Sequence, residues 1–597
     1  MTHLLVIGSP ALDTLHFGDE TVHYSPGGAG MYVAMAAHRS GTEVSMYGPH
    51  PEPMPEILQP IADRLKTWTG KKVRPEELPH FEISHKDDKA EYINFFLGSE
   101  SVMNPDDLPE DLSLYDGVHL TALGDTDLQN VFLQACRARG ARFISMGTFI
   151  KNIKEKPGLS RELTNESDVF FINEEEANLL FGSVDKAETH SGNIVYITLA
   201  DKGALVLQGN HRTYLPAAST KTKDPTGAGE TFCGAAVANL LNGAHPIIAG
   251  RRAIELAAEK IADIGPTTLL RDDPPPDAPL DTRVTINKNQ VEKIANVVKK
   301  LPEAGAFNFV DYYLPPEGHP AVLDYFFTVT LQQFSFWETV NGRYSKPLVA
   351  EIDGKMLKGS RYLYYAWTRL IDSDPEFFSP ERQANLTKED LKAVLRADDG
   401  SDPMPALDLH LKQANQYGED MLALGMTTED LITRAQKSVT PMKTFLMMLE
   451  HVGGYKEDPI RKKANLLALS LSERPEVFLT YGKQETVKPV VDYHCMRSCL
   501  RTGLIDVLDP DLKKKIANRE LLREDEEWAV RNAAYKIQEQ VEVLSGKPIA
   551  AVDWFFFNYT RNHCPEMSDP VCSKCAVDPV CAHRKELFQP VIRTTFY

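Results

Sequence analysis

The sequence predicts two domains of different fold class, an α/β domain followed by an all-α domain. In residues 1–271, short apolar segments of strand length alternate with helical stretches, which is typical of a mostly parallel sheet covered by helices. From residue 285 onward, apolar residues recur every three or four positions and strand signals are few, as expected for packed helices. Residues 272–284 are rich in proline, which excludes a helix or a central strand and favours an extended linker.

Length and charge limit the function further. A chain of 597 residues is too long for one hydrophobic core, so domains 1–271 and 285–597 are expected to fold around separate cores. No apolar run is long enough to span a bilayer, and the first residues lack the basic region of a secretion signal, so we expect a cytoplasmic protein without membrane contact. The net charge is -19, with about -15 in residues 1–280, so neither half is expected to coat nucleic acid.

Two glycine-rich turns stand out among the strands of the first domain. The turn at residues 26–30 precedes a helix of small residues and permits close backbone approach to a hydroxyl or phosphate, although such glycines often mark only a turn. The turn at residues 224–230 exposes successive amides at a helix N-terminus and ends on Glu230. Phosphoryl transfer needs amides that stabilise the developing negative charge and a base that accepts the proton of the attacking hydroxyl. The strand candidates are residues 4–8, 44–48, 117–120, 142–146, 169–172 and 194–198.

The first domain resembles the ribokinase-like family of sugar and nucleoside kinases, because these motifs follow one another along the chain in the order that the family shows. The resemblance covers essentially all of residues 1–271 and implies ATP and Mg²⁺ as cofactors. It implies that Asp13, Gly27 and Gly28 contact the sugar and that Glu230 is the catalytic base. On the side of the nucleotide it implies Asn173 and Glu176, linked to magnesium and phosphate, Thr198 and Gly203, and an anion hole of Asp224, Gly227, Ala228 and Gly229.

Two residues depart from the family pattern. Glu230 stands where the family has aspartate, and Tyr32 stands where it often has asparagine. A carboxylate that is one methylene longer reaches a hydroxyl if the sugar lies slightly further back, but a misplacement of about 1 Å costs about a hundredfold in rate. The alternatives are a working kinase and a domain kept for nucleoside sensing.

The first candidate site of the second domain is an aromatic segment, residues 326–337. Such rings can stack a planar base, which is worth about 1 to 3 kcal/mol per base. Most of the rings are expected in the core. Phe334 and Trp337 are expected to lie one helical turn apart and to be exposed to a ligand.

The second candidate site pairs a lysine with an aspartate. Residues 453–467 are expected to form a hairpin leading into the helix that carries Lys462 and Lys463, and Asp492 stands at the head of a helix whose arginines share one face. A cation and a carboxylate together suit cleavage of an N-glycosidic bond. The carboxylate stabilises an oxocarbenium-like sugar or orients water, while the lysine binds phosphate or acts at C1′. The structural alternative is a solvated basic turn and an N-cap aspartate.

The third candidate site is a group of four cysteines near the C-terminus. The thiols lie within eighteen residues at intervals of seven, two and five residues, with a single Cys-x-x-Cys pair. Without a secretion signal, this crowding indicates a metal site in a reducing compartment rather than disulfides. The spacing favours a [4Fe-4S] cluster of structural role over zinc, which usually uses two separated pairs. The expected ligands are Cys564, Cys572, Cys575 and Cys581.

The second domain resembles the helix-hairpin-helix glycosylase superfamily and, more closely, the queuosine salvage protein family of queuosine 5′-phosphate N-glycosylases. The resemblance implies catalysis by Asp492 with Lys462. The cysteine group is a departure from the queuosine family, and its first interval is one residue longer than in the endonuclease-three-like glycosylases. The resemblance rests on segments 331–337, 462–465, 492–493 and 593–597.

Together the halves predict a bifunctional salvage enzyme. The kinase would phosphorylate the 5′-hydroxyl of a modified nucleoside such as queuosine, and the second domain would release the base and ribose 5-phosphate, with the phosphate recognised by Lys462 or Lys463. The alternative is a DNA repair N-glycosylase attached to a kinase-like domain. Duplex binding draws on basic charge, which residues 281–597 lack, and Glu457 and Asp458 in the hairpin would repel a DNA phosphate. A small-molecule nucleoside is therefore favoured, while the base, the phosphate donor and a homodimer stay open.

Overall fold

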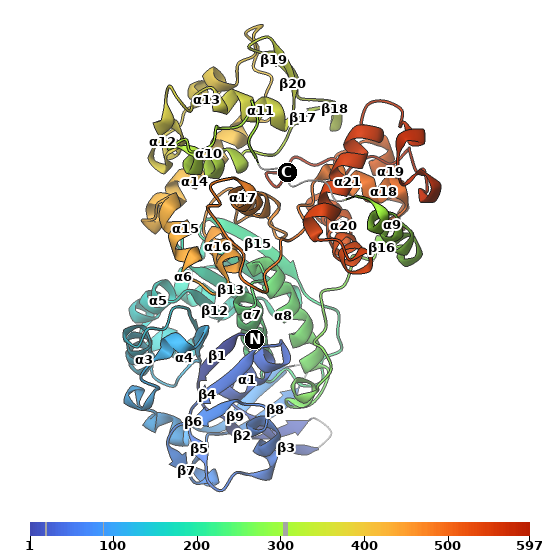
Figure 1. Ribbon diagram of the computed structural model, residues 1–597. Helices are drawn as coiled ribbons and strands as arrows, with labels where there is room; N and C mark the ends of the chain where they lie inside the picture. Colours follow the sequence, from blue (N-terminus) through green and yellow to red (C-terminus); the bar gives the residue numbers. More distant parts are fainter. Residues whose placement is uncertain (18–20, 87–88, 303–308) are drawn as a thin grey trace. The chain divides into compact units, whose positions relative to one another are not determined.

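The computed structural model describes residues 1–17, 21–86, 89–302 and 309–597 (Figure 1). The chain forms two compact units, Met1–Ala278 and Pro279–Tyr597. The first unit is α/β and the second is mostly helical, which confirms the predicted fold class. Among the described helices, none is long and apolar enough to cross a membrane.

The first unit is built on a nine-stranded sheet with the order β15-β14-β13-β12-β11-β10-β1-β4-β6. Pairing is parallel from β6 to β13, while β14 and β15 add an antiparallel edge. All six predicted strands lie in this sheet. Its strands are β1 (His3–Ile7), β4 (Glu43–Tyr47), β6 (Thr67–Thr69), β10 (Gly117–Leu120), β11 (Ile144–Gly147), β12 (Val169–Asn173), β13 (Ile194–Thr198), β14 (Gly203–Gln208) and β15 (His211–Pro216).

Helices cover both faces of this sheet, because successive side chains along each strand point to opposite faces. Leu4 and Val6 of β1 pack in one core with helices α1 and α7. Leu5 and Ile7 pack in a second core with α3 and α5. The helices of the unit are α1 (Ala29–Arg39), α2 (Gln59–Ala62), α3 (Thr126–Ala138), α4 (Ile150–Glu155), α5 (Pro157–Glu166), α6 (Glu174–Phe181), α7 (Ala228–Leu241) and α8 (Pro246–Ile261).

A smaller sheet with the order β3-β2-β8-β9 belongs to the same unit. Strand β2 carries Asp13, and its antiparallel pairing with β3 places Ala11 opposite Gly27. The first glycine turn is therefore held beside Asp13. The strands are β2 (Ala11–Phe17), β3 (Val22–Gly27), β8 (His80–Lys86) and β9 (Lys89–Phe96), and two further short strands, β5 (His50–Pro51) and β7 (Lys72–Val73), pair with each other.

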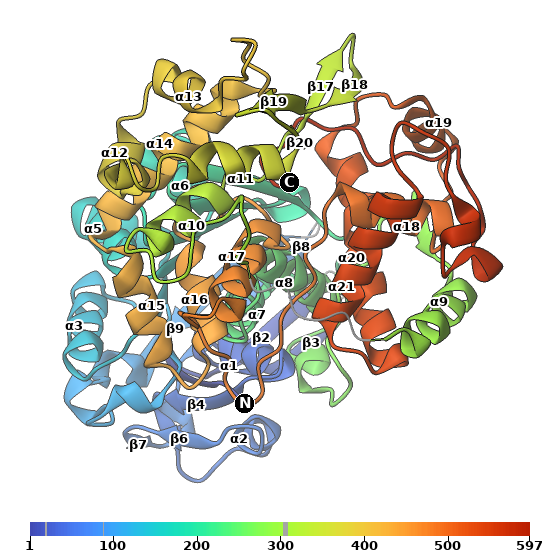
Figure 2. The same ribbon diagram turned by 45° about the horizontal axis from the view of Figure 1, so that its top comes forward.

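Over its described residues, the second unit is mostly helical, with three two-stranded sheets in addition (Figure 2). The sheets pair β16 (Val284–Ile286) with β21 (Ile505–Val507), β17 (Trp337–Val340) with β18 (Arg343–Pro347), and β19 (Val349–Ile352) with β20 (Lys355–Lys358). The helices are α9 (Lys288–Lys300), α10 (Val322–Thr330), α11 (Ser360–Thr368), α12 (Pro380–Ala384), α13 (Lys388–Leu395), α14 (Leu407–Leu424), α15 (Thr428–Gln436), α16 (Pro441–Leu449), α17 (Lys462–Glu473), α18 (Tyr493–Thr502), α19 (Pro510–Asn518), α20 (Glu524–Ser545) and α21 (Ile549–His563).

Two hydrophobic cores divide these helices. One core contains residues of α10, α11 and α13 to α17, and the other contains residues of α9 and α18 to α21. Helix α9 packs on α20 although more than 200 residues separate them in the chain. Lys462 begins α17 and Asp492 precedes α18, so the two predicted catalytic groups come from different cores of one unit.

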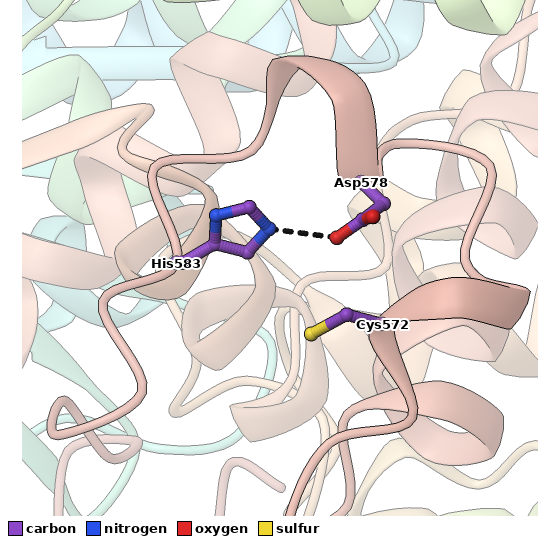
Figure 3. Close-up of side chains that lie close together, drawn as sticks. All are labelled: Cys572, Asp578 and His583. Carbon is purple, nitrogen blue, oxygen red and sulfur yellow. Dashed lines mark hydrogen bonds and ion pairs between the residues drawn. The ribbon is translucent and has the colours of Figure 1, made fainter.

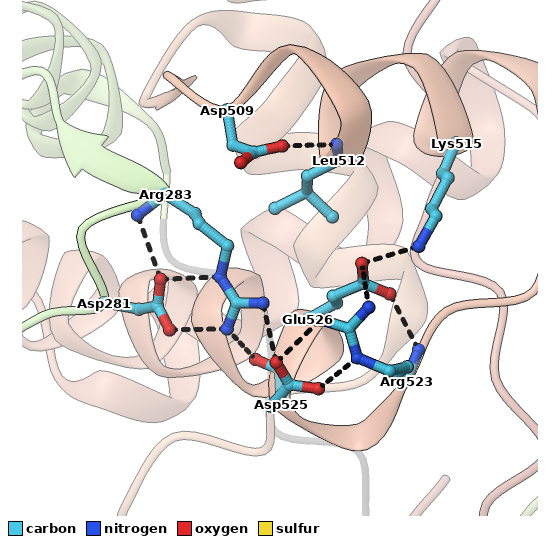
Figure 4. Close-up of polar contacts among 8 residues, drawn as sticks. All are labelled: Asp281, Arg283, Asp509, Leu512, Lys515, Arg523, Asp525 and Glu526. Atoms are coloured by element: carbon cyan, nitrogen blue, oxygen red, sulfur yellow. Dashed lines mark hydrogen bonds and ion pairs between the residues drawn. The ribbon is translucent and has the colours of Figure 1, made fainter.

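A network of charged side chains joins the residues just before β16 to the first turn of α20 (Figure 4). The Arg283 guanidinium donates to Asp281 (2.6 Å) and to Asp525 (2.7 Å), and Lys515 of α19 donates to Glu526 (2.7 Å). Such partly exposed pairs contribute about 0 to 1 kcal/mol each. Their effect is to fix the start of α20, which carries a buried arginine described below.

Candidate active sites

The predicted anion hole lies at the start of α7. Gly227 adopts a left-handed backbone conformation (φ 75°), and a Cβ atom there would lie 2.6 Å from the ring of Tyr32, so only glycine fits. Ala228 and Gly229 then begin the helix, where backbone N–H groups have no intrahelical acceptor. The first turn of α7 can therefore receive an anion.

Asp224 holds the loop that leads into this turn. Its carboxylate is fully buried and accepts hydrogen bonds from the amides of Thr226 (2.9 Å) and Gly265 (2.7 Å), and it lies 2.9 Å from Nε2 of His85. Burial favours the protonated acid, but His85, Lys260 and the two amides outweigh it and hold the pKa of Asp224 well below its ordinary value. Asp224 is therefore a charged anchor of the loop.

Glu230 lies in the first turn of α7, at the helix N-terminus that the turn at residues 224–230 predicted. Burial raises its pKa, and the Lys260 ammonium opposes this shift. Burial also raises the pKa of Glu176 to about 7, and repulsion from Glu230 adds to that shift. A carboxylate with a raised pKa is a stronger base, which suits removal of a proton from a hydroxyl.

Asp13 is a second buried carboxylate of this site. It is 4% exposed, and its Oδ1 atom has no hydrogen-bond partner among the described residues. Burial raises its pKa to about 7. A Cβ atom at Gly27 would lie 1.7 Å from the carboxylate, and Gly28 has a φ of 88°, so both glycines are required at these places. A buried oxygen without a partner needs a donor, and a sugar hydroxyl would supply one.

The buried phenol of Tyr32 lies among these carboxylates. Burial raises its pKa far above the ordinary value, and Asp224, Asp13 and Glu230 each add to the shift in that order. The structure thus brings the predicted sugar, loop and base residues around one side chain. Sequence reasoning noticed Tyr32 only as a departure from the family pattern.

Asn173 and Glu176 form a capping box at the start of α6. The Asn173 side chain accepts from the Glu176 amide (2.9 Å), and Glu176 accepts from the Asn173 amide (2.8 Å). Thr198 ends β13, and Gly203 begins β14 with a φ of 108°. A Cβ atom at Gly203 would lie 2.0 Å from the Leu215 carbonyl, so this glycine is required by the close strand.

In the second unit, Asp492 is the N-cap of α18. Its Oδ1 atom accepts from the amides of His494 (2.8 Å) and Cys495 (3.1 Å), so the structural alternative of an N-cap is realised. The side chain is 8% exposed, and burial raises its pKa, while Lys462 and the two amides oppose the shift. An aspartate held in this way is buried, oriented and within electrostatic range of the Lys462 ammonium.

Lys462 is the first residue of α17. Its ammonium donates to the carbonyl of Gln333 (3.3 Å), burial lowers its pKa, and the Asp492 charge raises it again. The structure therefore brings the predicted lysine and aspartate within electrostatic reach of each other.

The hairpin before α17 differs from expectation. Asp458 was expected to face outward and repel phosphate, but it is 2% exposed and accepts two hydrogen bonds from Arg531 of α20 (2.8 and 2.7 Å). It also accepts from the amide of Lys462 (2.7 Å). Because Arg531 neutralises it, Asp458 orients the start of α17 and cannot serve as a repulsive surface charge.

Asp553 of α21 is a further carboxylate at this site that sequence reasoning missed. Its Oδ1 atom accepts from the amide of Val490 (3.2 Å). Burial raises its pKa to about 8, and the charge of Asp492 adds to the shift. Two carboxyl groups of raised pKa beside one lysine favour a state in which the pair retains a proton. No motif in the sequence marks Asp553.

The expected exposure of Phe334 and Trp337 is wrong. Both rings are buried, Phe334 lies outside any helix, and Trp337 begins β17. Phe334 stacks on His410 (4.1 Å between ring centroids), and the ammonium of Lys463 lies 5.0 Å from the Phe334 centroid. Tertiary packing explains the difference, because both rings lie among core residues of the unit.

Lys463 is equally enclosed. Its ammonium donates to the carbonyl of Leu331 (2.9 Å). Burial lowers the pKa of Lys463 to about 7; the charge of Glu457 opposes this shift, and the charge of Lys462 adds to it. Lys463 therefore contacts the aromatic segment at Leu331 and Phe334. Trp337 is separate from this group and stacks on Tyr344 (5.2 Å between centroids).

The four predicted metal ligands line one cavity together with Arg501 and His563. Arg501 of α18 donates to the sulfur of Cys564 (3.1 Å) and to the carbonyl of Pro565 (3.1 Å). A second group overlaps with it, in which ligand atoms of Cys572, Asp578 and His583 lie within 4.8 Å of one another (Figure 3). Asp578 and His583 were missed, although both lie inside or just after the cysteine segment.

The cysteine segment is bonded to the helix that begins at Asp492. Arg497, on the same helix as Arg501, lies 3.6 Å from the carboxylate of Glu566, which also lies 3.1 Å from Lys358. The amide of Ala582 donates to the carbonyl of Thr502 (3.2 Å), at the other end of α18. The segment thus contacts α18 along much of its length.

Comparisons with known proteins give a separate match for each of the two units. Residues 1–273 match the family model of pfkB family carbohydrate kinases, and residues 313–576 match that of Queuosine salvage protein. A cytidine kinase of Thermococcus kodakarensis is 26% identical over 252 residues, covering 41% of this chain and 90% of that protein.

Solved structures also resemble the first unit. A probable sugar kinase protein from Rhizobium etli is 17% identical with a TM-score of 0.39, covering 45% of this chain and 97% of its own. A nucleoside kinase of Burkholderia thailandensis in complex with inosine is 18% identical with a TM-score of 0.38, covering 45% and 94%. By its two family matches, the chain carries an N-terminal ribokinase-like domain of the pfkB type and a C-terminal queuosine salvage protein domain.

Proposed function

We propose that the chain is a two-step nucleoside salvage enzyme. The first unit transfers a phosphoryl group from ATP to the 5′-hydroxyl of a modified nucleoside, of which queuosine is the favoured example. The second unit hydrolyses the N-glycosidic bond of the product and releases a queuine-like base and ribose 5-phosphate. The observation that carries this proposal is the presence, in one chain, of a kinase domain and a queuosine salvage domain that each enclose buried carboxylates.

In the first step, three parts of the kinase unit act on the substrates. The free oxygen of Asp13 accepts from a sugar hydroxyl and fixes the sugar. Glu230 removes the proton of the 5′-hydroxyl, for which its raised pKa is suited. The amides at the start of α7 hold the charge that develops on the transferred phosphoryl group. When bound, Mg²⁺ neutralises phosphate charge, and Glu176 is the carboxylate that would hold it.

In the second step, Asp492 and Lys462 act on the sugar nucleotide. As the base departs, positive charge develops on the sugar, which becomes oxocarbenium-like. The Asp492 carboxylate stabilises this charge or orients the attacking water. Lys462 and the two amides favour the ionised form of Asp492, while Asp553 keeps the proton of the pair. The enclosed position of Lys462 excludes bulk water from this charge pair.

For the cysteine cavity we propose a [4Fe-4S] cluster held by Cys564, Cys572, Cys575 and Cys581. Four thiols around one cavity, with Arg501 donating to one sulfur, form a donor set that matches such a cluster. Zinc held by Cys572, Asp578 and His583 is the alternative, because these ligand atoms also converge. The bound group would supply a rigid crosslink beside α18 rather than chemistry on the nucleotide.

Spectroscopy separates the two metals. A broad absorbance near 400 nm that dithionite bleaches is expected for the cluster, whereas a colourless protein containing zinc would refute it. Replacement of Cys575 with serine is expected to remove the chromophore and to weaken base release, while ATP-dependent phosphorylation by the other unit persists.

The experiment that tests the function uses purified protein, ATP, magnesium and a panel of nucleosides that includes queuosine and cytidine, with products followed by mass spectrometry. We expect a nucleoside 5′-phosphate and then free base. The cysteine cavity also suits a DNA repair N-glycosylase, so duplex DNA carrying damaged bases is tested in parallel. Base release from DNA with none from any nucleotide would favour that alternative and refute the salvage function.

A further inference from the structure

Lys260, near the end of α8, places a buried cation directly beneath the anion-hole loop. Its side chain has no exposed surface, and its ammonium donates to the carbonyl of Asp224 (2.9 Å) and to the carbonyl of Thr226. It also lies 3.3 Å from the Asp224 carboxylate and 5.3 Å from the centroid of the Tyr32 ring. None of the motifs described above includes this residue.

The protonated form of Lys260 fits these contacts. An ammonium group has three N–H donors and no acceptor, and three oxygen atoms of two residues surround it here. Burial lowers the pKa of Lys260, and the charge of Asp224 opposes the shift. A buried charge is costly unless it is paired and hydrogen-bonded, and both conditions are met at this place.

The contact with Thr226 determines the direction of the first amide of the anion hole. A peptide unit is planar and trans, so the carbonyl of Thr226 and the N–H of Gly227 point in opposite directions. Because Lys260 holds the carbonyl on the buried side, the Gly227 N–H is turned away from that side. The side chains of Thr226 and Asp224 are also hydrogen-bonded to His85 of β8, which fixes the rest of the loop.

We propose that Lys260 is a positioning residue of the kinase site, a cation tethered to the chain that orients the peptide between Thr226 and Gly227. Its oxygen ligands are those that a free monovalent cation of similar size would use, so the side chain stands in for such an ion. The inference rests on the proposed kinase function. It has two consequences: turnover needs no added monovalent cation, and removal of the side chain creates a cation site.

The test replaces Lys260 with alanine and measures phosphorylation in chloride salts of ammonium, potassium and choline at equal ionic strength. In choline, kcat is expected to fall about 100-fold or more, as for the loss of a group that orients an oxyanion donor. The KM for the nucleoside is expected to change little, because Asp13 is untouched. Ammonium or potassium is expected to restore at least about a tenth of wild-type turnover in a saturable manner, whereas wild-type turnover is the same in all three salts.

Two control variants sharpen this result. In Lys260→Met, the uncharged side chain fills the space, so ammonium is expected to give no rescue. Lys223 lies beside the same loop, but its half-exposed ammonium pairs with Asp263 (3.5 Å), so Lys223→Ala is expected to keep wild-type turnover and salt response.

Thermal unfolding supplies a readout that does not depend on activity. Ammonium or potassium is expected to raise the unfolding temperature of Lys260→Ala above its value in choline, and to leave the wild type unchanged, because only the variant offers a cation site. Turnover of Lys260→Ala near that of the wild type, or a loss that neither cation restores together with an unfolding temperature that neither raises, would overturn the inference. A wild-type protein without any kinase activity would instead refute the proposed function.

Discussion

Replacement of Asp492 with asparagine separates the charge of this residue from its role as a helix cap. Asparagine caps helices as well as aspartate does, so its side-chain oxygen can keep the bonds from the amides of His494 and Cys495. The negative charge beside the developing sugar cation is lost. Loss of one preorganised electrostatic group costs about 100- to 1,000-fold in kcat, or about 2.7 to 4 kcal/mol, and we expect at least this decrease in base release.

The assay starts from a chemically prepared nucleoside 5′-phosphate, so that the kinase step is bypassed, and measures free base by chromatography. Asp492→Ala is the matched control, because it removes the cap as well as the charge and should cost about 1 kcal/mol more in the free energy of unfolding. Base release by Asp492→Asn within tenfold of the wild type would refute the assignment of the carboxylate and leave only the cap.

Three further predictions concern other buried charges. Glu230→Gln should abolish phosphorylation and leave base release from a prepared nucleotide unchanged, and retention of kinase turnover would exclude Glu230 as the base. Arg531→Met should lower the free energy of unfolding of the second unit by about 3 to 5 kcal/mol, because Asp458 stays buried without its partner, and adding Asp458→Asn should recover most of the loss in a denaturation experiment. Asp553 has a folded pKa of about 8, above its unfolded value of about 3.9, so the folded unit holds a proton that the unfolded chain releases between these values. The free energy of unfolding of the second unit should therefore fall as pH rises from about 4 to about 8, and Asp553→Asn should weaken this pH dependence.

Local patterns in the sequence were sufficient for the first unit and for the positions of its turns. Strand alternation and glycine placement are properties of neighbouring residues, so the strand candidates and the required glycines at 27, 28, 203 and 227 could be predicted. The burial of Lys260 next to the anion-hole loop could not be predicted, because a buried lysine and a surface lysine look alike in a sequence. Lys260 meets Asp224 only when α8 packs against the loop 36 residues earlier.

In the second unit the same limit explains the errors. Phe334 and Trp337 are aromatic residues in an apolar segment, and their burial depends on contacts with His410 and Tyr344 from other elements. Asp458 reads as a surface charge until Arg531, 73 residues later, is placed beside it. The four cysteines could be singled out because they are close in the chain, and the structure places all four around one cavity. Asp553 has no such neighbours in the sequence.

The proposed function requires one chain to phosphorylate a nucleoside and then to cleave the product. The most direct measurement incubates the wild-type protein with queuosine and magnesium, with and without ATP, and follows nucleoside 5′-phosphate and free base over time. We predict that free base forms only with ATP, after the phosphate appears, and that Asp492→Asn accumulates the phosphate without base. Base release at the same rate without ATP, or phosphate that the wild-type protein never cleaves, would contradict the claim.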